Sequence, residues 1–89
     1  MNNDFNIEFG SLYCFPNRSK SCYRRDVFDD TETFVLSPRK MFVPLELTKY
    51  EDIHKWYKLK ILLTNGEIWY TDITQEGIEF MELVTNENL

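Results

Sequence analysis

Hydrophobic and polar residues alternate most clearly in the C-terminal third of the chain. Two runs rich in β-branched and aromatic residues, 56–64 and 67–73, flank the dipeptide Asn65-Gly66. Asn-Gly between two such runs is typical of a β-hairpin, because both central residues of a two-residue type I′ turn need a positive φ. We therefore predict a hairpin with a two-residue turn, in a register that pairs Leu62 with Trp69.

This register decides which side chains share a face, because successive residues of a strand point to opposite sides of the sheet. The face opposite the core is mostly polar, but it carries Leu62 and Trp69 as an adjacent cross-strand pair. Either this pair lies beneath another element or it forms an exposed apolar patch. Together with Trp56 it is the best candidate for a protein-binding site, because aromatic anchors dominate interface energies. The predicted core face carries Leu59, Ile61, Leu63, Ile68 and Tyr70.

Four further strands are predicted from the apolar residues in the rest of the chain. They span 5–15, 33–36, 41–47 and 78–84. Pro44 has no amide hydrogen to donate to a neighbouring strand, so strand 41–47 is placed at a sheet edge or at a bulge.

Helical structure is predicted in two short segments. Thr48 and Glu51 have the spacing of a capping box, so we expect a turn or two of helix over 49–56. A single helical turn closed by glycine is expected at 74–77. Residues 17–32 are polar and are predicted to form a long irregular loop.

The length of 89 residues fits one domain, 1–89, with flexible ends at 1–4 and 85–89. No window approaches the roughly 20 apolar residues of a membrane span, and no basic-then-apolar leader opens the chain. We therefore expect a cytoplasmic protein that does not contact a membrane. Its two cysteines, Cys14 and Cys22, are then expected to be free thiols.

The net charge of −5 argues against generic nucleic-acid binding, which usually requires a basic surface. All ten lysines and arginines lie between Arg18 and Lys60, and every charged residue after Lys60 is acidic. This acidic part of the chain is either a solvated surface or a surface for a basic partner.

An alternative site, for single-stranded RNA or DNA, lies in the segment 18–25. Cations and aromatic residues are interleaved there, and in such sites aromatic rings stack on bases while cations follow the phosphates. The competing interpretation is a surface loop whose arginines pair with the acidic residues at 26–32. The residues of this candidate site are Arg18, Lys20, Tyr23, Arg24 and Arg25.

Residues suited to catalysis or metal binding are few. His54 is the only histidine, and with Cys14 and Cys22 it matches no zinc-binding spacing. No motif places a nucleophile beside a base, and the carboxylates at 29–32 are expected to be only solvated. We therefore expect a protein that is not an enzyme and that has no metal or cofactor site.

Two stretches resemble SH3-like domains. Residues 11–15, Ser-Leu-Tyr-Cys-Phe, look like the Ala-Leu-Tyr-Asp-Tyr opening of SH3 domains. Residues 62–70, Leu-Leu-Thr-Asn-Gly-Glu-Ile-Trp-Tyr, followed by the run 78–84, are similar to the ending of many small SH3-like and KOW-like domains, which are frequent in proteins of large tailed phages. The segment 69–75 lacks the proline and second tyrosine of peptide-binding SH3 domains, so recognition of a proline-rich ligand is not expected.

Pattern and resemblance together predict a mainly-β fold, a small SH3-like barrel of five to six strands with one short helix. The expected function is that of a non-enzymatic protein-interaction module, an accessory or regulatory factor that binds a protein partner. The resemblance suggests a phage protein acting on a host target. One alternative is single-stranded RNA or DNA binding through 18–25. A second is a self-associating structural component, a homodimer in which strand 41–47 pairs across a sheet edge.

Overall fold

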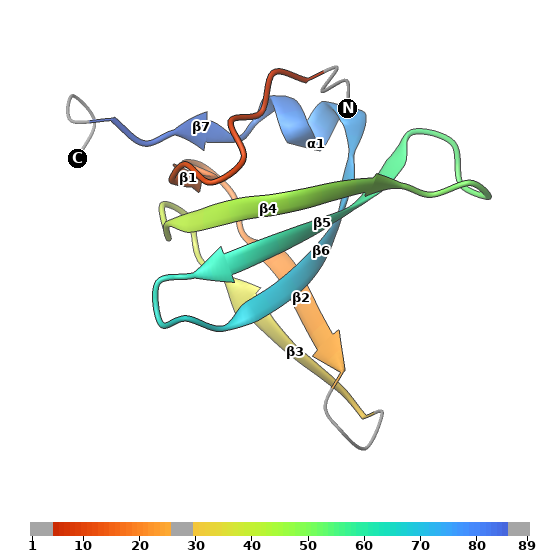
Figure 1. The fold of residues 1–89 in the computed structure, drawn as a ribbon, viewed down its shortest axis with the longest axis horizontal. Coiled ribbons are helices and arrows are strands. Elements are labelled where there is room, and N and C mark those ends of the chain that lie inside the picture. Colours follow the sequence, from red (N-terminus) through yellow and green to blue (C-terminus); the bar gives the residue numbers. More distant parts are fainter. Residues whose placement is uncertain (1–4, 26–29, 86–89) are drawn as a thin grey trace.

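The protein folds into an antiparallel sheet of seven strands with a short helix before the last strand (Figure 1). The computed structural model describes residues 5–25 and 30–85. Across the sheet the strands follow the order β3-β2-β6-β5-β4-β1-β7. In chain order the elements are β1 (Tyr13–Cys14), β2 (Lys20–Arg25), β3 (Thr31–Leu36), β4 (Phe42–Lys49), β5 (Trp56–Leu63), β6 (Ile68–Thr74), α1 (Gln75–Glu79) and β7 (Glu82–Leu83).

The predicted mainly-β fold with one short helix is confirmed, but the sheet is not closed into a barrel. β3 and β7 stand at the two ends of the strand order, and among the described residues they do not pair with each other. The strand number is seven rather than five or six because part of the predicted loop at 17–32 is also strand. An open antiparallel sheet of this size is compatible with an SH3-like fold.

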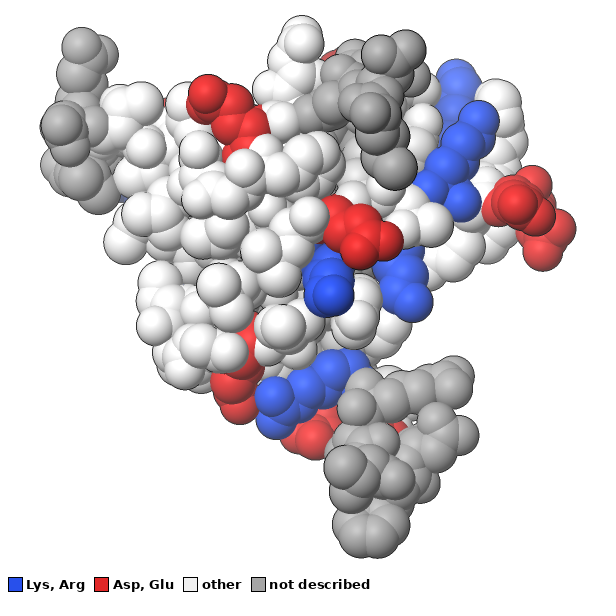
Figure 2. All heavy atoms as spheres, in the orientation of Figure 1, with Lys and Arg blue, Asp and Glu red and all other residues white. Residues whose placement is uncertain are grey.

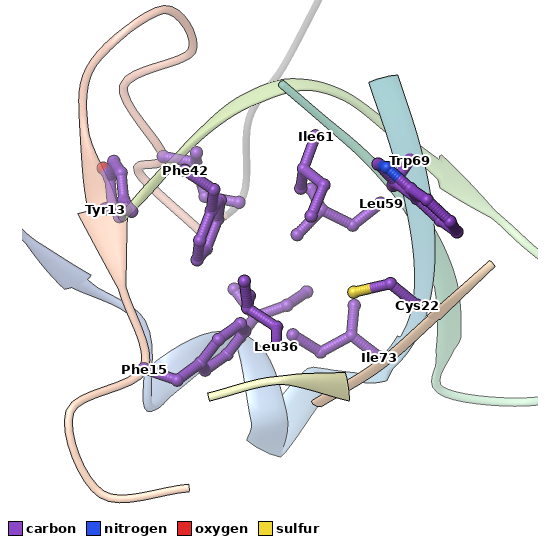
Figure 3. Packing of buried hydrophobic residues seen from close by; sticks show 11 residues of the cluster. Tyr13, Phe15, Cys22, Leu36, Phe42, Leu59, Ile61, Trp69 and Ile73 are labelled. Carbon is purple, nitrogen blue, oxygen red and sulfur yellow. The ribbon is translucent and has the colours of Figure 1, made fainter. Parts of the chain in front are cut away.

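The core lies on one side of the curved sheet, where side chains from β1 to β6 and from α1 meet (Figure 3). The rings of Phe15 and Phe42 stack with their centroids 5.4 Å apart. Burial of this apolar surface is the main driving force of the fold, at about 25 cal/mol per Å². Both cysteines are buried free thiols, as predicted. The buried cluster consists of Ile7, Tyr13, Phe15, Cys22, Leu36, Phe42, Leu59, Ile61, Trp69, Ile73 and Ile78.

The hairpin of β5 and β6 is confirmed, but its predicted register is wrong by one residue. Leu62 pairs with Ile68, and Ile61 pairs with Trp69. A shift of one residue moves side chains to the opposite face relative to their partners. Trp69 therefore lies on the core face, and Ile68, which is 43% exposed, lies on the other. Of the predicted core face, Leu59 and Ile61 are buried and Leu63 is half-buried, whereas Ile68 and Tyr70 lie on the opposite face.

A three-residue loop causes the shift. The Gly66 amide donates to the Leu63 carbonyl at 3.0 Å, and the Leu63 amide donates to the Glu67 carbonyl at 2.8 Å. Gly66 has a φ of 88°, whereas Asn65 has no positive φ. This is a type I turn followed by a left-handed glycine, not the predicted type I′ turn. The Asn65 side chain supports the loop, because its Oδ1 accepts a hydrogen bond from the Glu67 amide at 3.0 Å.

β4 and β5 form a second hairpin where the capping-box pattern predicts a helix. Lys49 still pairs with Tyr57 at the end of the two strands. The Tyr50 amide then donates to the Trp56 carbonyl at 3.0 Å, which closes a loop rather than a helical turn. The helix predicted over 49–56 is therefore wrong, because strand pairing on both sides of the segment outweighs the local cap signal.

β4 is an internal strand of the sheet, between β5 and β1. Phe42 pairs with Leu63 of β5 on one side and with Tyr13 of β1 on the other. The pairing of β4 with β5 shifts between Pro44 and Glu46. The proline therefore lies at a bulge, which is one of the two predicted alternatives. β1 pairs with β4 only at Phe42, and the Gly10 amide donates to the Pro44 carbonyl at 3.0 Å, so self-association through 41–47 stays a prediction.

The segment 17–32 is not the predicted irregular loop, because it contains β2 and the start of β3. These strands pair over six residue pairs without a shift. Tyr23 of β2 also pairs with Tyr70 of β6, which attaches the β2–β3 hairpin to the rest of the sheet. Cys22 points into the core and is 1% exposed. The predicted strand 33–36 is confirmed as part of β3.

Strands are shorter than predicted at both ends of the chain. Only Tyr13–Cys14 of the segment 5–15 and only Glu82–Leu83 of the segment 78–84 are strand. The helical turn after β6 is confirmed but extends to Glu79 as α1. Thr74 caps it, because its Oγ1 accepts a hydrogen bond from the Gly77 amide at 3.0 Å. The ends 1–4 and 86–89, for which flexibility is predicted, lie outside the described residues.

Candidate protein-binding surface

The sheet has a second face, which we term the outer face, formed by the side chains of β2 to β6 that point away from the core. It is the side on which Leu62, Ile68 and Tyr70 lie, and it continues across Tyr23 onto β3. The outer face carries Tyr23, Val35, Val43, Trp56, Lys58, Lys60, Leu62, Ile68, Tyr70 and Asp72.

Trp69, one of the three predicted protein-binding residues, is only 5% exposed and lies in the core. Its ring packs edge-on against Phe34 with centroids 4.6 Å apart, and the Arg24 guanidinium lies 4.3 Å from its centroid. The sequence left open whether Trp69 is covered by another element or exposed in an apolar patch. In the structure Trp69 is covered. It does not share a patch with Leu62.

Leu62 instead belongs to a cross-strand row of aliphatic side chains, Val43, Leu62 and Ile68, which we term the apolar row. Leu62 pairs with Val43 of β4 and with Ile68 of β6, so the three lie side by side on the outer face. Val43 and Leu62 are half-buried and Ile68 is exposed. β-Branched and aliphatic neighbours across strands stabilise the sheet, and the exposed part of the row is available to a partner.

Three tyrosines gather around Asp72 next to the apolar row, and we term Tyr23, Tyr50, Tyr70 and Asp72 the tyrosine cluster. The hydroxyls of Tyr50 and Tyr23 donate to the same oxygen, Asp72 Oδ1, at 2.6 and 2.9 Å. The rings of Tyr23 and Tyr70 stack with centroids 6.0 Å apart. Lys58 Nζ lies 4.7 Å from the Tyr70 centroid, within the range of a cation–π contact. The cluster thus ties β2, β6 and the loop after β4 together.

The hydroxyls of Tyr23 and Tyr50 are held in their protonated form. Burial raises the pKa of Tyr23 well above its ordinary value, and the hydrogen bonds to Tyr50 and Asp72 act in the same direction. The hydrogen bond to Asp72 likewise raises the pKa of Tyr50. A tyrosine that acts as a general base needs the opposite shift. The two hydroxyls are therefore suited to fixing the shape of the surface rather than to proton transfer.

Trp56 lies on the outer face as well, at the other end of β5 from Leu62. The two are six residues apart, which corresponds to about 20 Å along a strand, and Lys58 and Lys60 lie between them. Trp56 is 38% exposed and lines an open groove of about 470 Å³ between the β4–β5 loop and α1. One cation, Lys55, and two carboxylates, Glu76 and Glu79, share this groove, so it favours no single ligand charge. Its lining residues are His54, Lys55, Trp56, Thr74, Gln75, Glu76 and Glu79.

The candidate nucleic-acid-binding residues lie on and beside β2, and those whose side chains are described already contact groups of this chain. Arg24 forms ion pairs with Glu32 at 3.3 Å and with Glu67 at 3.1 Å. The predicted pairing of an arginine with the acidic residues at 26–32 thus holds for Arg24. The Arg24 guanidinium also covers the ring of Trp69.

The remaining members of that site are similarly engaged. Lys20 Nζ donates to the Asp72 carbonyl at 2.8 Å, and burial lowers its pKa. The Arg18 guanidinium lies 3.7 Å from the centroid of the Phe80 ring. Tyr23 belongs to the tyrosine cluster, and the side chain of Arg25 lies outside the described residues. Figure 2 shows basic and acidic side chains interspersed, with no continuous basic area among the described residues of the face in view.

The described residues bring together no group of three or more histidine, cysteine, aspartate or glutamate side chains that could hold a metal ion. Cys22 is in the core, where burial raises its pKa to about 11, whereas His54 is exposed in the β4–β5 loop. A thiol of this kind is a poor nucleophile, because the reactive form is the thiolate.

Comparisons with family models, with curated proteins and with solved structures find no match to this chain. Within residues 5–25 and 30–85, no helix has the length and apolar character needed to cross a membrane.

Sequence reasoning missed Ile68 and Tyr70 as surface residues because the predicted register placed both in the core. A usable signal was present in Thr64-Asn65-Gly66. Gly66 suits the left-handed position of a three-residue loop as well as it suits a type I′ turn, and the Asn65 side chain can bond to the backbone two residues on.

Proposed function

We propose that the protein is a non-enzymatic protein-interaction module that binds a protein partner through the outer face of its sheet. The observation that carries this proposal is the apolar row, with Ile68 43% exposed, directly beside the tyrosine cluster. The centres of protein interfaces are poor in charge and rich in aromatic residues such as tyrosine, with hydrogen-bonding groups at their rim. The row supplies aliphatic contact area, and the tyrosines supply rigid rings.

Binding of single-stranded RNA or DNA is the weaker alternative. It requires cations that are free to neutralise phosphates. Arg24 is held by two carboxylates, and Lys20 is held by a backbone carbonyl. The carboxylates offset the charge of Arg24 and the carbonyl occupies the ammonium group of Lys20, so both cations are less available to a nucleic acid.

The narrower proposal, an accessory or regulatory factor of a tailed phage that acts on a host protein in the cytoplasm, rests on the SH3-like and KOW-like resemblance alone. It is an analogy of fold and short motifs, and fold does not determine function. The outer-face proposal does not depend on it.

Partner capture with matched variants tests the outer-face proposal. Tagged protein is incubated with lysate of the cells in which the chain is expressed, with and without nuclease, and washed at low and at high salt. Two variants are compared with the wild type. Ile68→Lys places a charge in the apolar row, and Ile53→Lys places the same charge at a similarly exposed isoleucine in the β4–β5 loop.

We expect a discrete protein that survives nuclease and high salt, is retained by Ile53→Lys and is lost with Ile68→Lys. An apolar interface tolerates salt, whereas phosphate contacts weaken steeply with it. Material that disappears with nuclease would assign the protein to nucleic-acid binding. Equal capture by the two variants would place the binding site away from the apolar row.

A further inference from the structure

β3, the strand at one end of the sheet, has an edge to which another strand can add. It is the first strand in the sheet order, and its only described strand partner is β2. The other end of the sheet is β7, which is two residues long, whereas β3 is six residues long. An edge strand of this length presents a row of backbone N–H and C=O groups to which another strand can add.

Apart from one charged residue, Glu32, β3 lacks the features with which proteins usually protect such an edge. Natural edge strands carry lysine, proline or a bulge. The sequence Thr-Glu-Thr-Phe-Val-Leu contains no lysine or proline, and its pairing with β2 runs without a shift. Its outer-face residue Val35 is 61% exposed, more than any other large hydrophobic side chain of the described residues.

The charges on β3 suit pairing with an identical strand. Its single charged residue, Glu32, is held by Arg24 of β2 at 3.3 Å. In an antiparallel pair centred on Phe34, Thr33 of one copy faces Val35 of the other, and Glu32 faces Leu36. No charged residue then opposes a like charge, and the β-branched pair covers the exposed valine. Such a pair is self-complementary, as a two-fold interface requires.

We propose that β3 pairs antiparallel with β3 of a second copy of this chain, joining two seven-stranded sheets edge to edge. The interface is short, so the association is weak and depends on protein concentration. Each copy carries a net charge of −5, and the two copies repel each other at long range. Salt screens this repulsion, and dimerisation therefore strengthens as salt is added. A basic partner strand on the same edge would show the opposite dependence on salt.

Sedimentation equilibrium of the purified protein, from about 1 µM to about 1 mM and at low and high salt, tests the proposal. Val35→Lys adds the edge-protecting lysine at an exposed position, and Ile53→Lys is its matched control in the β4–β5 loop. We expect wild type and Ile53→Lys to dimerise, more tightly at high salt. We expect Val35→Lys to raise the dissociation constant at least tenfold, which corresponds to about 1.4 kcal/mol.

Hydrogen exchange on the wild-type protein gives a readout that needs no variant. As protein concentration rises, amides of β3 should become protected while those of the β4–β5 loop do not change. A protein that stays monomeric throughout, a dimer that forms equally in Val35→Lys, or a dimer that weakens with salt would each overturn the proposal. None of these results bears on capture of a partner by the outer face, because the experiment contains this chain alone.

Discussion

Trp69→Ala and Leu62→Ala should differ strongly in cost, because the observed register places Trp69 in the core and Leu62 on the outer face. A buried tryptophan removes roughly 150–250 Å² from water, which at about 25 cal/mol per Å² corresponds to about 4–6 kcal/mol as an upper estimate. Measured Trp→Ala substitutions in cores cost about 3–5 kcal/mol. Trp69 also loses its contacts with Phe34 and Arg24. Leu62 is half-buried, so its truncation should cost only about 1 kcal/mol.

Urea unfolding followed by far-ultraviolet circular dichroism measures both costs without relying on the tryptophan that is removed. A domain of this length has a free energy of unfolding of about 4–13 kcal/mol, so Trp69→Ala can remove most of it. Trp69→Phe keeps a ring in the core and should cost about 1–3 kcal/mol. This variant should stay folded, with a free energy of unfolding between those of the wild type and Trp69→Ala. A cost for Leu62→Ala equal to or above that of Trp69→Ala would refute the observed register and restore the two-residue turn.

Three further measurements test the loop, the thiols and the acid response. Gly66→Ala should lower the free energy of unfolding by about 1–2 kcal/mol. A side chain there would have open space, but the backbone has a left-handed φ of 88°, which is strained for alanine. An unchanged urea midpoint would contradict this. Cys22, with its pKa raised to about 11 by burial, should react with a disulfide reagent at pH 8 only after unfolding; rapid reaction of the folded protein would refute its burial. Hydrogen bonds from Asn65, and then from Trp69, lower the pKa of Glu67, so its stabilising contribution is present above its ordinary pKa of 4.5 and is lost as pH falls through the lower folded-state pKa. Glu67→Gln should therefore reduce the loss of stability on acidification, and an identical acid profile would count against this assignment.

Strong alternation and turn signals were sufficient to predict the centre of the sheet. The runs around Asn65-Gly66 predicted β5 and β6, and the segments 41–47 and 33–36 predicted most of β4 and the last four residues of β3. The bulge was one of two alternatives that followed from the missing amide hydrogen of Pro44. Thr74 predicted a helical turn because its hydroxyl can accept a backbone amide. In these cases local chemistry and tertiary pairing favour the same structure.

β2 was not predicted because its core-facing positions are mostly charged. Lys20, Cys22 and Arg24 alternate on the inner side, and only Cys22 is apolar. Arg24 covers Trp69 with its guanidinium while its charge reaches two carboxylates at the surface. A long cationic side chain can thus occupy a core-edge position without producing the hydrophobic alternation by which a strand is recognised.

The outer face could not be assigned correctly from sequence, because its composition depends on a single residue of loop length. Thr64-Asn65-Gly66 is compatible with a two-residue and with a three-residue loop, and the two differ by one step in register. That step exchanges Trp69 for Ile68 at the surface. Leu62 and Trp56 of the predicted hot spot both lie on the outer face, but only the folded sheet shows that they stand at opposite ends of β5.

The open sheet makes partner binding and self-association separable by single substitutions. Closure into a barrel would have joined β3 to the far end of the sheet and removed its free edge, but β7 is only two residues long and pairs with β1. Among residues 5–25 and 30–85, no strand lies beside the outer edge of β3, which leaves this edge to solvent or to another strand. Ile68 lies two strands away from it, on β6, and Val35 lies on β3 itself. A variant that loses the partner but keeps the dimer, together with a second variant that does the reverse, would show that the outer face and the β3 edge of this small sheet serve two independent contacts.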